Sequence, residues 1–127
     1  MAYRYQKHYT RDEARALLPQ VRLWLKRIAQ LRTDLEKQDE RLATCMSGGN
    51  DLGGKLVNSW VRTLVGIKEV LLDFHNRQIE LKDLDRGLVD FPAIIDGKEV
   101  FFCWEQGEAD IEFWHDLDAG YAGREPL

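Results

Sequence analysis

A seven-residue repeat of apolar side chains runs through the first third of this chain. The repeat comprises Ala14, Val21, Ile28, Leu35 and Leu42, and a companion row comprises Leu17, Trp24 and Leu31. Two rows at these spacings predict a long helix with a coiled-coil-like seam. Thr10 and Glu13 have the spacing of a capping box, which predicts that the helix begins there. Because Pro19 removes one helical hydrogen bond, we expect a kink near residues 15–19 or a new helix starting there.

A glycine-rich segment at residues 47–54 interrupts this helical pattern. It holds four glycines in eight residues, which cannot sustain a helix and favour a flexible turn. Apolar residues at spacings of three and four resume over residues 55–80. We therefore expect residues 10–80 to form an antiparallel two-helix hairpin with its tip at 47–54. The glycines are not followed by the Lys-Ser/Thr of a phosphate-binding loop, so we assign no cofactor-binding residue.

The predicted hairpin is longer than a compact globule of this size. A helix over residues 11–45 would span about 52 Å. A compact chain of 127 residues has a radius of gyration of about 14 Å. The far end of the hairpin carries apolar residues that need cover, namely Leu35, Leu42, Val57 and Val61. A second copy would provide it in a four-helix bundle, so we expect a homodimer through the helical hairpin.

The periodicity changes after residue 82 from helical spacing to the alternation of β-strands. Three strands are predicted, over residues 87–95, 98–104 and 110–115. Pro92 cannot donate a ladder hydrogen bond, which places the first strand at a sheet edge. Residues 116–127 show no period and are expected to wrap over the sheet as an extended tail.

The turn between the first two predicted strands determines how they pair. Asp96-Gly97 is a strong signal for a two-residue hairpin turn, which fixes the register and places Asp90 opposite Cys103. A four-residue loop to the third strand would place His115 on the opposite face from Asp90.

These patterns together predict the α+β fold class. We expect a single domain over residues 1–127, with a helical hairpin at 10–80, a three-stranded antiparallel β-meander at 87–115 and an extended C-terminal tail at 116–127.

Charge is distributed unevenly along the chain. Residues 1–32 hold eight Lys/Arg and two Asp/Glu, whereas residues 83–127 hold three Lys/Arg and twelve Asp/Glu. We expect the basic first helix to pack on the acidic C-terminal third, within one chain or across a dimer. The acidic third argues against nucleic-acid binding. The sequence shows no membrane-spanning run or signal peptide and only two cysteines, which predicts a cytoplasmic protein.

Several strings in the C-terminal third resemble a known family. They are Leu84-Asp85-Arg86-Gly87-Leu88-Val89-Asp90-Phe91-Pro92-Ala93, Cys103-Trp104, Gly107-Glu108, Trp114-His115 and Gly120-Tyr121-Ala122-Gly123-Arg124. The chain resembles an uncharacterised bacterial family, the domain of unknown function numbered 2203. The resemblance implies a bacterial cytosolic protein and brings no known activity or catalytic residue.

The acidic third also contains candidate metal ligands. Two carboxylates and one imidazole, Asp90, Glu108 and His115, would suit a divalent transition metal such as Zn, Mn or Fe. In the alternative, Asp90 caps the tail or pairs with Arg124, and His115 hydrogen-bonds a backbone carbonyl. A Cys103 nucleophile lacks a histidine partner in the predicted register.

Two function hypotheses follow from these features. The first is a non-enzymatic dimeric binding or adaptor module with an unknown protein partner, favoured by the long helical seam without a catalytic motif. The alternative is a divalent-metal-binding protein or metal-dependent enzyme with its site in the acidic C-terminal third. Whether the protein is an enzyme, and which residues would be catalytic, stays open at this point.

Overall fold

The structure is a computed structural model that describes residues 2–48 and 54–127. Helix α1 spans Arg11–Ser47, helix α2 spans Gly54–Asn76, and a five-stranded antiparallel sheet follows. The predicted α+β class is therefore confirmed. Most of the predicted glycine-rich tip, residues 49–53, lies outside the described residues. Neither described helix has the length and apolar character needed to cross a membrane.

The chain divides into two compact units. We call Met1–Leu23 with Asp73–Leu127 the sheet unit, and Trp24–Leu72 the helical unit. Both helices contribute residues to both units.

Helix α1 begins at the predicted capping box. The Glu13 amide donates to Thr10 Oγ1 at 3.1 Å, and the Thr10 amide donates to Glu13 Oε1 at 3.0 Å. These bonds satisfy two amides at the helix start. The helix runs on through Pro19, so no new helix starts there. Because Pro19 lies on the exposed side, water can bond the Arg15 carbonyl that loses its helical partner.

Within the helical unit, α1 and α2 contact each other at two defined points. Trp60 Nε1 donates to Asp39 Oδ1 at 2.9 Å. A Cβ atom added at Gly66 would lie 3.2 Å from Leu31 Cδ1, so the two helices approach closely there. Leu31 is buried, whereas Leu35 and Leu42 further along α1 are only partly buried. The far end of the seam therefore lacks a fully buried core residue among the described residues.

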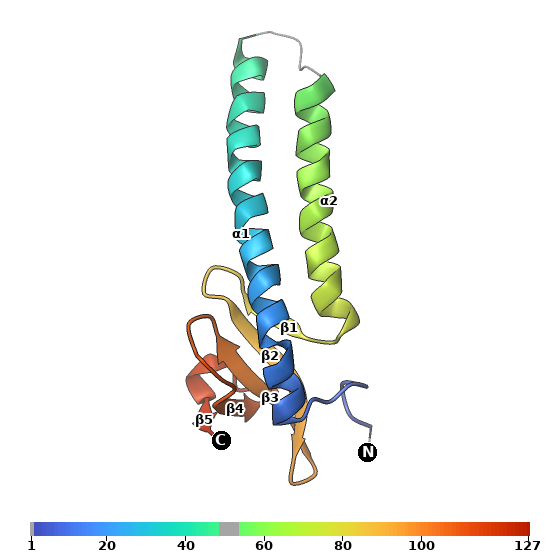
Figure 1. Ribbon diagram of the computed structural model, residues 1–127, viewed down its shortest axis with the longest axis vertical. Helices are drawn as coiled ribbons and strands as arrows, with labels where there is room; N and C mark the ends of the chain where they lie inside the picture. Colours follow the sequence, from blue (N-terminus) through green and yellow to red (C-terminus); the bar gives the residue numbers. More distant parts are fainter. Residues whose placement is uncertain (1, 49–53) are drawn as a thin grey trace. The chain divides into compact units, whose positions relative to one another are not determined.

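The sheet unit contains five strands rather than the three predicted. They are β1 (Glu80–Asp83), β2 (Leu88–Ile95), β3 (Lys98–Glu105), β4 (Phe113–Asp116) and β5 (Glu125–Pro126). They lie in chain order and all pair antiparallel (Figure 1). The sequence did not reveal β1 and β5 because strands this short show no measurable alternation. The predicted extended tail instead forms a short 3₁₀ helix, Tyr121–Gly123, and then β5.

The hairpin between β2 and β3 has the predicted register. Asp90 pairs with Cys103, and Ile95 pairs with Lys98. Asp96 and Gly97 both have positive φ angles, 50° and 78°, as a two-residue turn of this kind requires. The expectation that β2 is an edge strand was wrong, because β1 pairs with its first half. Pro92 lies just beyond that pairing, where its missing N–H breaks no ladder bond with β1.

Strand β4 begins three residues later than predicted and differs in register. His115 pairs with Phe101, and Phe101 pairs with Pro92, so His115 shares a face with Asp90. The expected placement on opposite faces was wrong. The connection between β3 and β4 is longer than four residues, and its length sets the face of every residue after it.

Both faces of the central strands are buried. One face carries Val89, Phe91 and Trp104, each with no exposed surface, and Tyr9 and Arg22 contact the rings of Phe91 and Trp104. The other face carries Asp90 and His115, and we call it the polar face.

Basic residues of the N-terminal part pair with acidic residues of the C-terminal third inside the sheet unit. Arg15 Nε lies 2.7 Å from Asp110 Oδ1, and Arg4 Nη2 lies 3.2 Å from Asp118 Oδ1. Arg11 Nε donates to the Ile111 carbonyl at 2.8 Å. The predicted packing of the basic N-terminal part on the acidic third is confirmed within one chain.

Candidate metal centre

Three adjacent strands bring three potential metal ligands together on the polar face. Asp90 comes from β2, Cys103 from β3 and His115 from β4. Their exposed fractions are 1%, 0% and 2%. One donor atom from each lies within 4.8 Å of the other two. The set contains a carboxylate, a thiol and an imidazole, which are the ligand types that zinc uses in proteins.

The hydrogen bonds of His115 determine which ring nitrogen carries a proton. Nδ1 lies 2.7 Å from the Asp116 carbonyl oxygen, which can only accept, so Nδ1 must be the donor. Nε2 lies 3.0 Å from Asp90 Oδ2. In a neutral ring of this tautomer, Nε2 presents a lone pair to a carboxylate oxygen. Two acceptors at this separation need a cation between them, either a proton or a metal ion.

The Asp90 carboxylate is only partly satisfied. Its Oδ1 atom is buried and has no hydrogen-bond partner among the described residues. Burial raises the pKa of Asp90 above its usual value, and the contacts with His115, Cys103 and Lys82 oppose that shift without cancelling it. A buried, unpaired carboxylate oxygen is uncommon in native proteins and calls for a partner.

Cys103 is a neutral thiol in the metal-free protein. Burial and the adjacent Asp90 carboxylate raise its pKa to about 12, although the Arg124 guanidinium opposes the shift. A thiol with this pKa is protonated near neutral pH and is a poor nucleophile. A histidine partner does lie nearby, unlike in the predicted register, but the high pKa still disfavours nucleophilic catalysis by Cys103.

Residues from both ends of the sheet unit border the polar face. Tyr5 packs edge-on against the Phe101 ring at 5.4 Å between centroids, and the Lys82 ammonium lies 4.9 Å from the same ring. The Arg124 guanidinium lies 4.0 Å from the centre of the Phe113 ring. Together with the burial of the three ligands, these contacts make a buried binding site rather than an open cleft.

The structure brings two of the three sequence-predicted ligands together and places the third elsewhere. Asp90 and His115 are in contact, whereas the Glu108 carboxylate pairs with Arg124 at 2.9 Å and accepts the Glu105 amide at 2.7 Å. The tail is therefore pinned by Glu108 and Arg124, not by Asp90. Cys103 takes the third place in the cluster. The Asp90–Cys103 pairing in the predicted register was the signal that could have found it.

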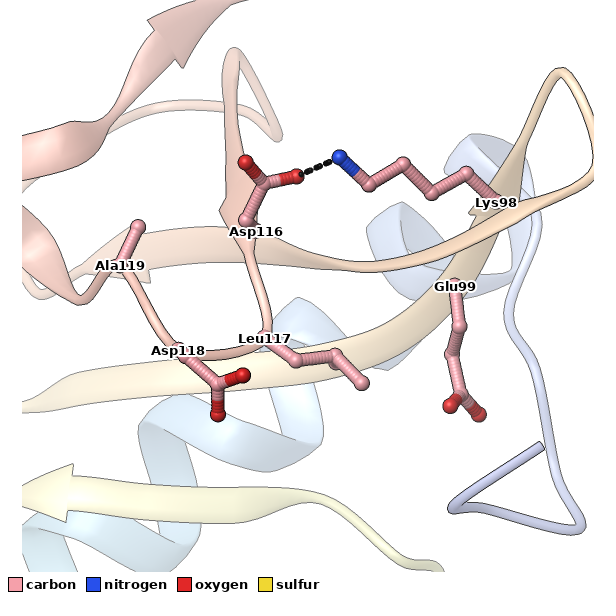
Figure 2. Close-up of a pocket in the computed structure, with 6 residues that line it drawn as sticks. All are labelled: Lys98, Glu99, Asp116, Leu117, Asp118 and Ala119. Atoms are coloured by element: carbon pink, nitrogen blue, oxygen red, sulfur yellow. Dashed lines mark ion pairs between the residues drawn. The ribbon is translucent and has the colours of Figure 1, made fainter.

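A separate shallow pocket lies on the surface of the sheet unit. Its lining is drawn in Figure 2 and comprises Lys98, Glu99, Asp116, Leu117, Asp118 and Ala119. An ion pair of 2.7 Å joins Lys98 and Asp116, and the Glu99 carboxylate points away from that pair (Figure 2). Glu99 binds His8 at 2.7 Å and accepts the amides of Arg4 and Tyr5. Because these charged groups already have internal partners, the pocket is a weaker ligand site than the buried cluster.

Comparison with known protein families identifies one family that matches this chain. A family model described as "Uncharacterized conserved protein (DUF2203)" matches residues 7–127. The chain belongs to the DUF2203 family. No curated protein and no solved structure matches it significantly. Family membership therefore confirms the resemblance seen in the sequence but supplies no known chemistry for this DUF2203 protein.

Proposed function

We propose that this protein binds a divalent transition metal ion, with zinc the best match, through Asp90, Cys103 and His115. The observation that carries the proposal is the His115 tautomer. Its Nδ1–H bonds the Asp116 carbonyl, which directs the Nε2 lone pair toward Asp90 Oδ2. A backbone carbonyl that orients the ring in this way is the usual support of a metal-binding histidine.

The charges around the site suit a divalent ion. An ionised Asp90 and an ionised Cys103 would together balance a 2+ ion, so the buried site would carry no net charge. The nearby Arg124 is balanced by Glu108, at 2.9 Å. Metal binding would also displace the thiol proton of Cys103, because thiolate is the form that ligates zinc.

The geometry requires only a small adjustment. Donor atoms on a tetrahedral zinc ion lie about 3.5 Å apart, given bond lengths of about 2.0–2.3 Å. The three donors here lie within 4.8 Å of one another, so closing on the ion needs movements of about 1 Å. The orphaned Asp90 Oδ1 supports the same conclusion, because a metal ion would engage this carboxylate.

The burial of the site favours a structural role over a catalytic one. The three ligands come from neighbouring strands, so an ion would link β2, β3 and β4. Each ligand is at most 2% exposed, which leaves a substrate no access. A metal that binds only the folded state stabilises it. We therefore expect a chelator to lower the melting temperature of the loaded protein.

The test is metal loading of the full chain purified without a metal-affinity tag. Elemental analysis should find about one zinc per chain after incubation and removal of excess metal. Cobalt substitution should produce the near-ultraviolet thiolate-to-cobalt charge-transfer band, which reports Cys103 directly. The Cys103→Ser variant should lose this band.

The second cysteine supplies a matched control. Cys45 lies in the helical unit and outside the cluster, so Cys45→Ser should keep both the zinc and the cobalt band. Absence of stoichiometric metal, or a cobalt band that survives Cys103→Ser, would exclude this site. A shared proton between Asp90 and His115 would then account for their contact.

A second candidate function is a binding module formed by the helices. The observation in its favour is the set of large apolar side chains that α2 exposes, which includes Val61, Val65 and Leu72. Exposed apolar surface of this kind marks interaction sites on soluble proteins. This role is independent of the metal centre, and a protein could have both.

A further inference from the structure

Helix α2 carries an exposed apolar surface within the helical unit. Its members share spacings of three, four and seven residues and are 38–48% exposed: Val61, Leu64, Val65, Leu71 and Leu72. At about 100° per residue they occupy an arc of about 120°. We call this surface the α2 stripe.

The α2 stripe is distinct from the surface that α2 turns toward α1. Thr63 and Val70 are buried, and Gly66 approaches Leu31 of α1 closely. On a helical wheel the centre of the stripe lies about 140° from Thr63. Helix α2 therefore has one buried side, which α1 approaches at Gly66, and a separate apolar side that stays 38–48% exposed.

We infer that the α2 stripe is the contact surface of a homodimer in which two copies of α2 pack antiparallel across a two-fold axis. This inference rests on the second candidate function, a binding role for the helices, and does not depend on the metal centre. The partner that covers the stripe is a second copy of this chain, because charged residues beside the stripe on one copy can pair with oppositely charged residues on the other.

The first charge argument concerns the flank of the stripe. Arg62 and Glu69 are exposed, lie on the same flank and are seven residues apart, or about 10.5 Å along the axis. The midpoint between them falls between Val65 and Gly66, about one residue from the middle of the stripe. In an antiparallel pair, Arg62 of one protomer lies opposite Glu69 of its partner, and symmetry creates this contact twice. A parallel pair would instead place the two Arg62–Glu69 flanks on opposite sides of the contact, where they could not pair with each other.

The second charge argument concerns Lys68, which lies within the stripe and is exposed. In a parallel pair, the two Lys68 ammonium groups would meet. In an antiparallel pair centred on the stripe, each Lys68 lies beside the apolar Leu64 region of its partner, and its long stem lets the ammonium reach water. A single lysine in the apolar seam of a coiled coil specifies register and oligomer state at some cost in stability. Lys68 therefore favours the same arrangement as Arg62 and Glu69.

The test is the oligomeric state of the full chain by sedimentation over a dilution series, in the presence of a chelator. We expect a concentration-dependent dimer. Val65→Glu buries a charge in the centre of the contact and should make the protein monomeric, while circular dichroism shows unchanged helix content because Val65 is 48% exposed. Arg27→Glu, an exposed change on α1, is the matched control and should leave the dimer intact.

Charge reversal tests the antiparallel pairing itself. Arg62→Glu alone and Glu69→Arg alone should each weaken dimerisation by about tenfold, because each creates two like-charge contacts. The double variant should restore the wild-type dissociation constant. A wild-type monomer at every concentration, or a dimer insensitive to Val65→Glu, would overturn the interface. The antiparallel pairing would be overturned if Val65→Glu disrupts the dimer while the double variant, Arg62→Glu with Glu69→Arg, dimerises no better than the single reversals.

Discussion

Replacing His115 by leucine would leave the Asp90 carboxylate buried without its partner. Leucine roughly fills the space of the imidazole, so the main change is the loss of the contact at 3.0 Å between Nε2 and Asp90 Oδ2. Breaking a buried pair by removing one partner costs about 3–5 kcal/mol. The variant can limit that cost by protonating the buried carboxylate, so the free energy of protonation sets an upper bound on the destabilisation. At pH 7, protonating a carboxyl with an ordinary pKa near 3.9 costs about 4 kcal/mol.

We therefore expect His115→Leu to lower the free energy of unfolding by about 4 kcal/mol, out of the 5–15 kcal/mol typical of a domain. The measurement is urea denaturation in the presence of a chelator, followed by tryptophan fluorescence, to which the buried Trp104 contributes. A chelator is needed because bound metal would add its own stabilisation to the wild type.

Two companion variants separate the lost partner from simple disruption of the core. Asp90→Asn should cost less than about 1.5 kcal/mol, because the amide can donate to the Nε2 lone pair. Asp90→Leu with His115→Leu should recover most of the loss, since a buried pair can often be replaced by apolar residues. The reasoning would be refuted if His115→Leu cost less than about 1 kcal/mol, or if Asp90→Asn cost as much as His115→Leu.

Three further predictions concern other parts of the structure. Partial burial tends to raise the pKa of Glu99, but hydrogen bonds from His8 and two backbone amides outweigh it and lower the pKa below its usual value. The stabilisation from Glu99 should therefore be full at neutral pH and be lost as the pH falls through its lowered pKa, and Glu99→Gln should flatten this part of the acid-unfolding curve. Gly66→Leu should destabilise the protein by about 1–3 kcal/mol in urea, because a side chain there would strike α1, whereas helix propensity alone predicts a gain. In the native metal-free protein, iodoacetamide should label the partly buried Cys45 well before the buried Cys103, and mass spectrometry showing equal rates would contradict the described burial.

Local chemistry in the sequence was enough to predict several features. The capping box of Thr10 and Glu13 and the register set by Asp96-Gly97 both formed as expected. Each depends on residues close together in the chain, so no distant contact is needed to decide it. The charge asymmetry also correctly indicated that the basic start packs on the acidic third.

Only the tertiary structure decided how the candidate metal centre is assembled. A two-residue turn allows one register, whereas the longer connection between β3 and β4 allows either parity, and a shift of one residue moves His115 to the other face. Pairing of β4 with β3 places His115 beside Asp90, and pairing of β4 with β5 brings in a tail that the sequence left without structure. Glu108 looked like a ligand because its partner, Arg124, is distant in the chain and comes near only after β5 has joined the sheet. The sequence by itself therefore determined the two helices, the hairpin of β2 and β3 and the types of ligand present. Long-range strand pairing determined which of those ligands meet.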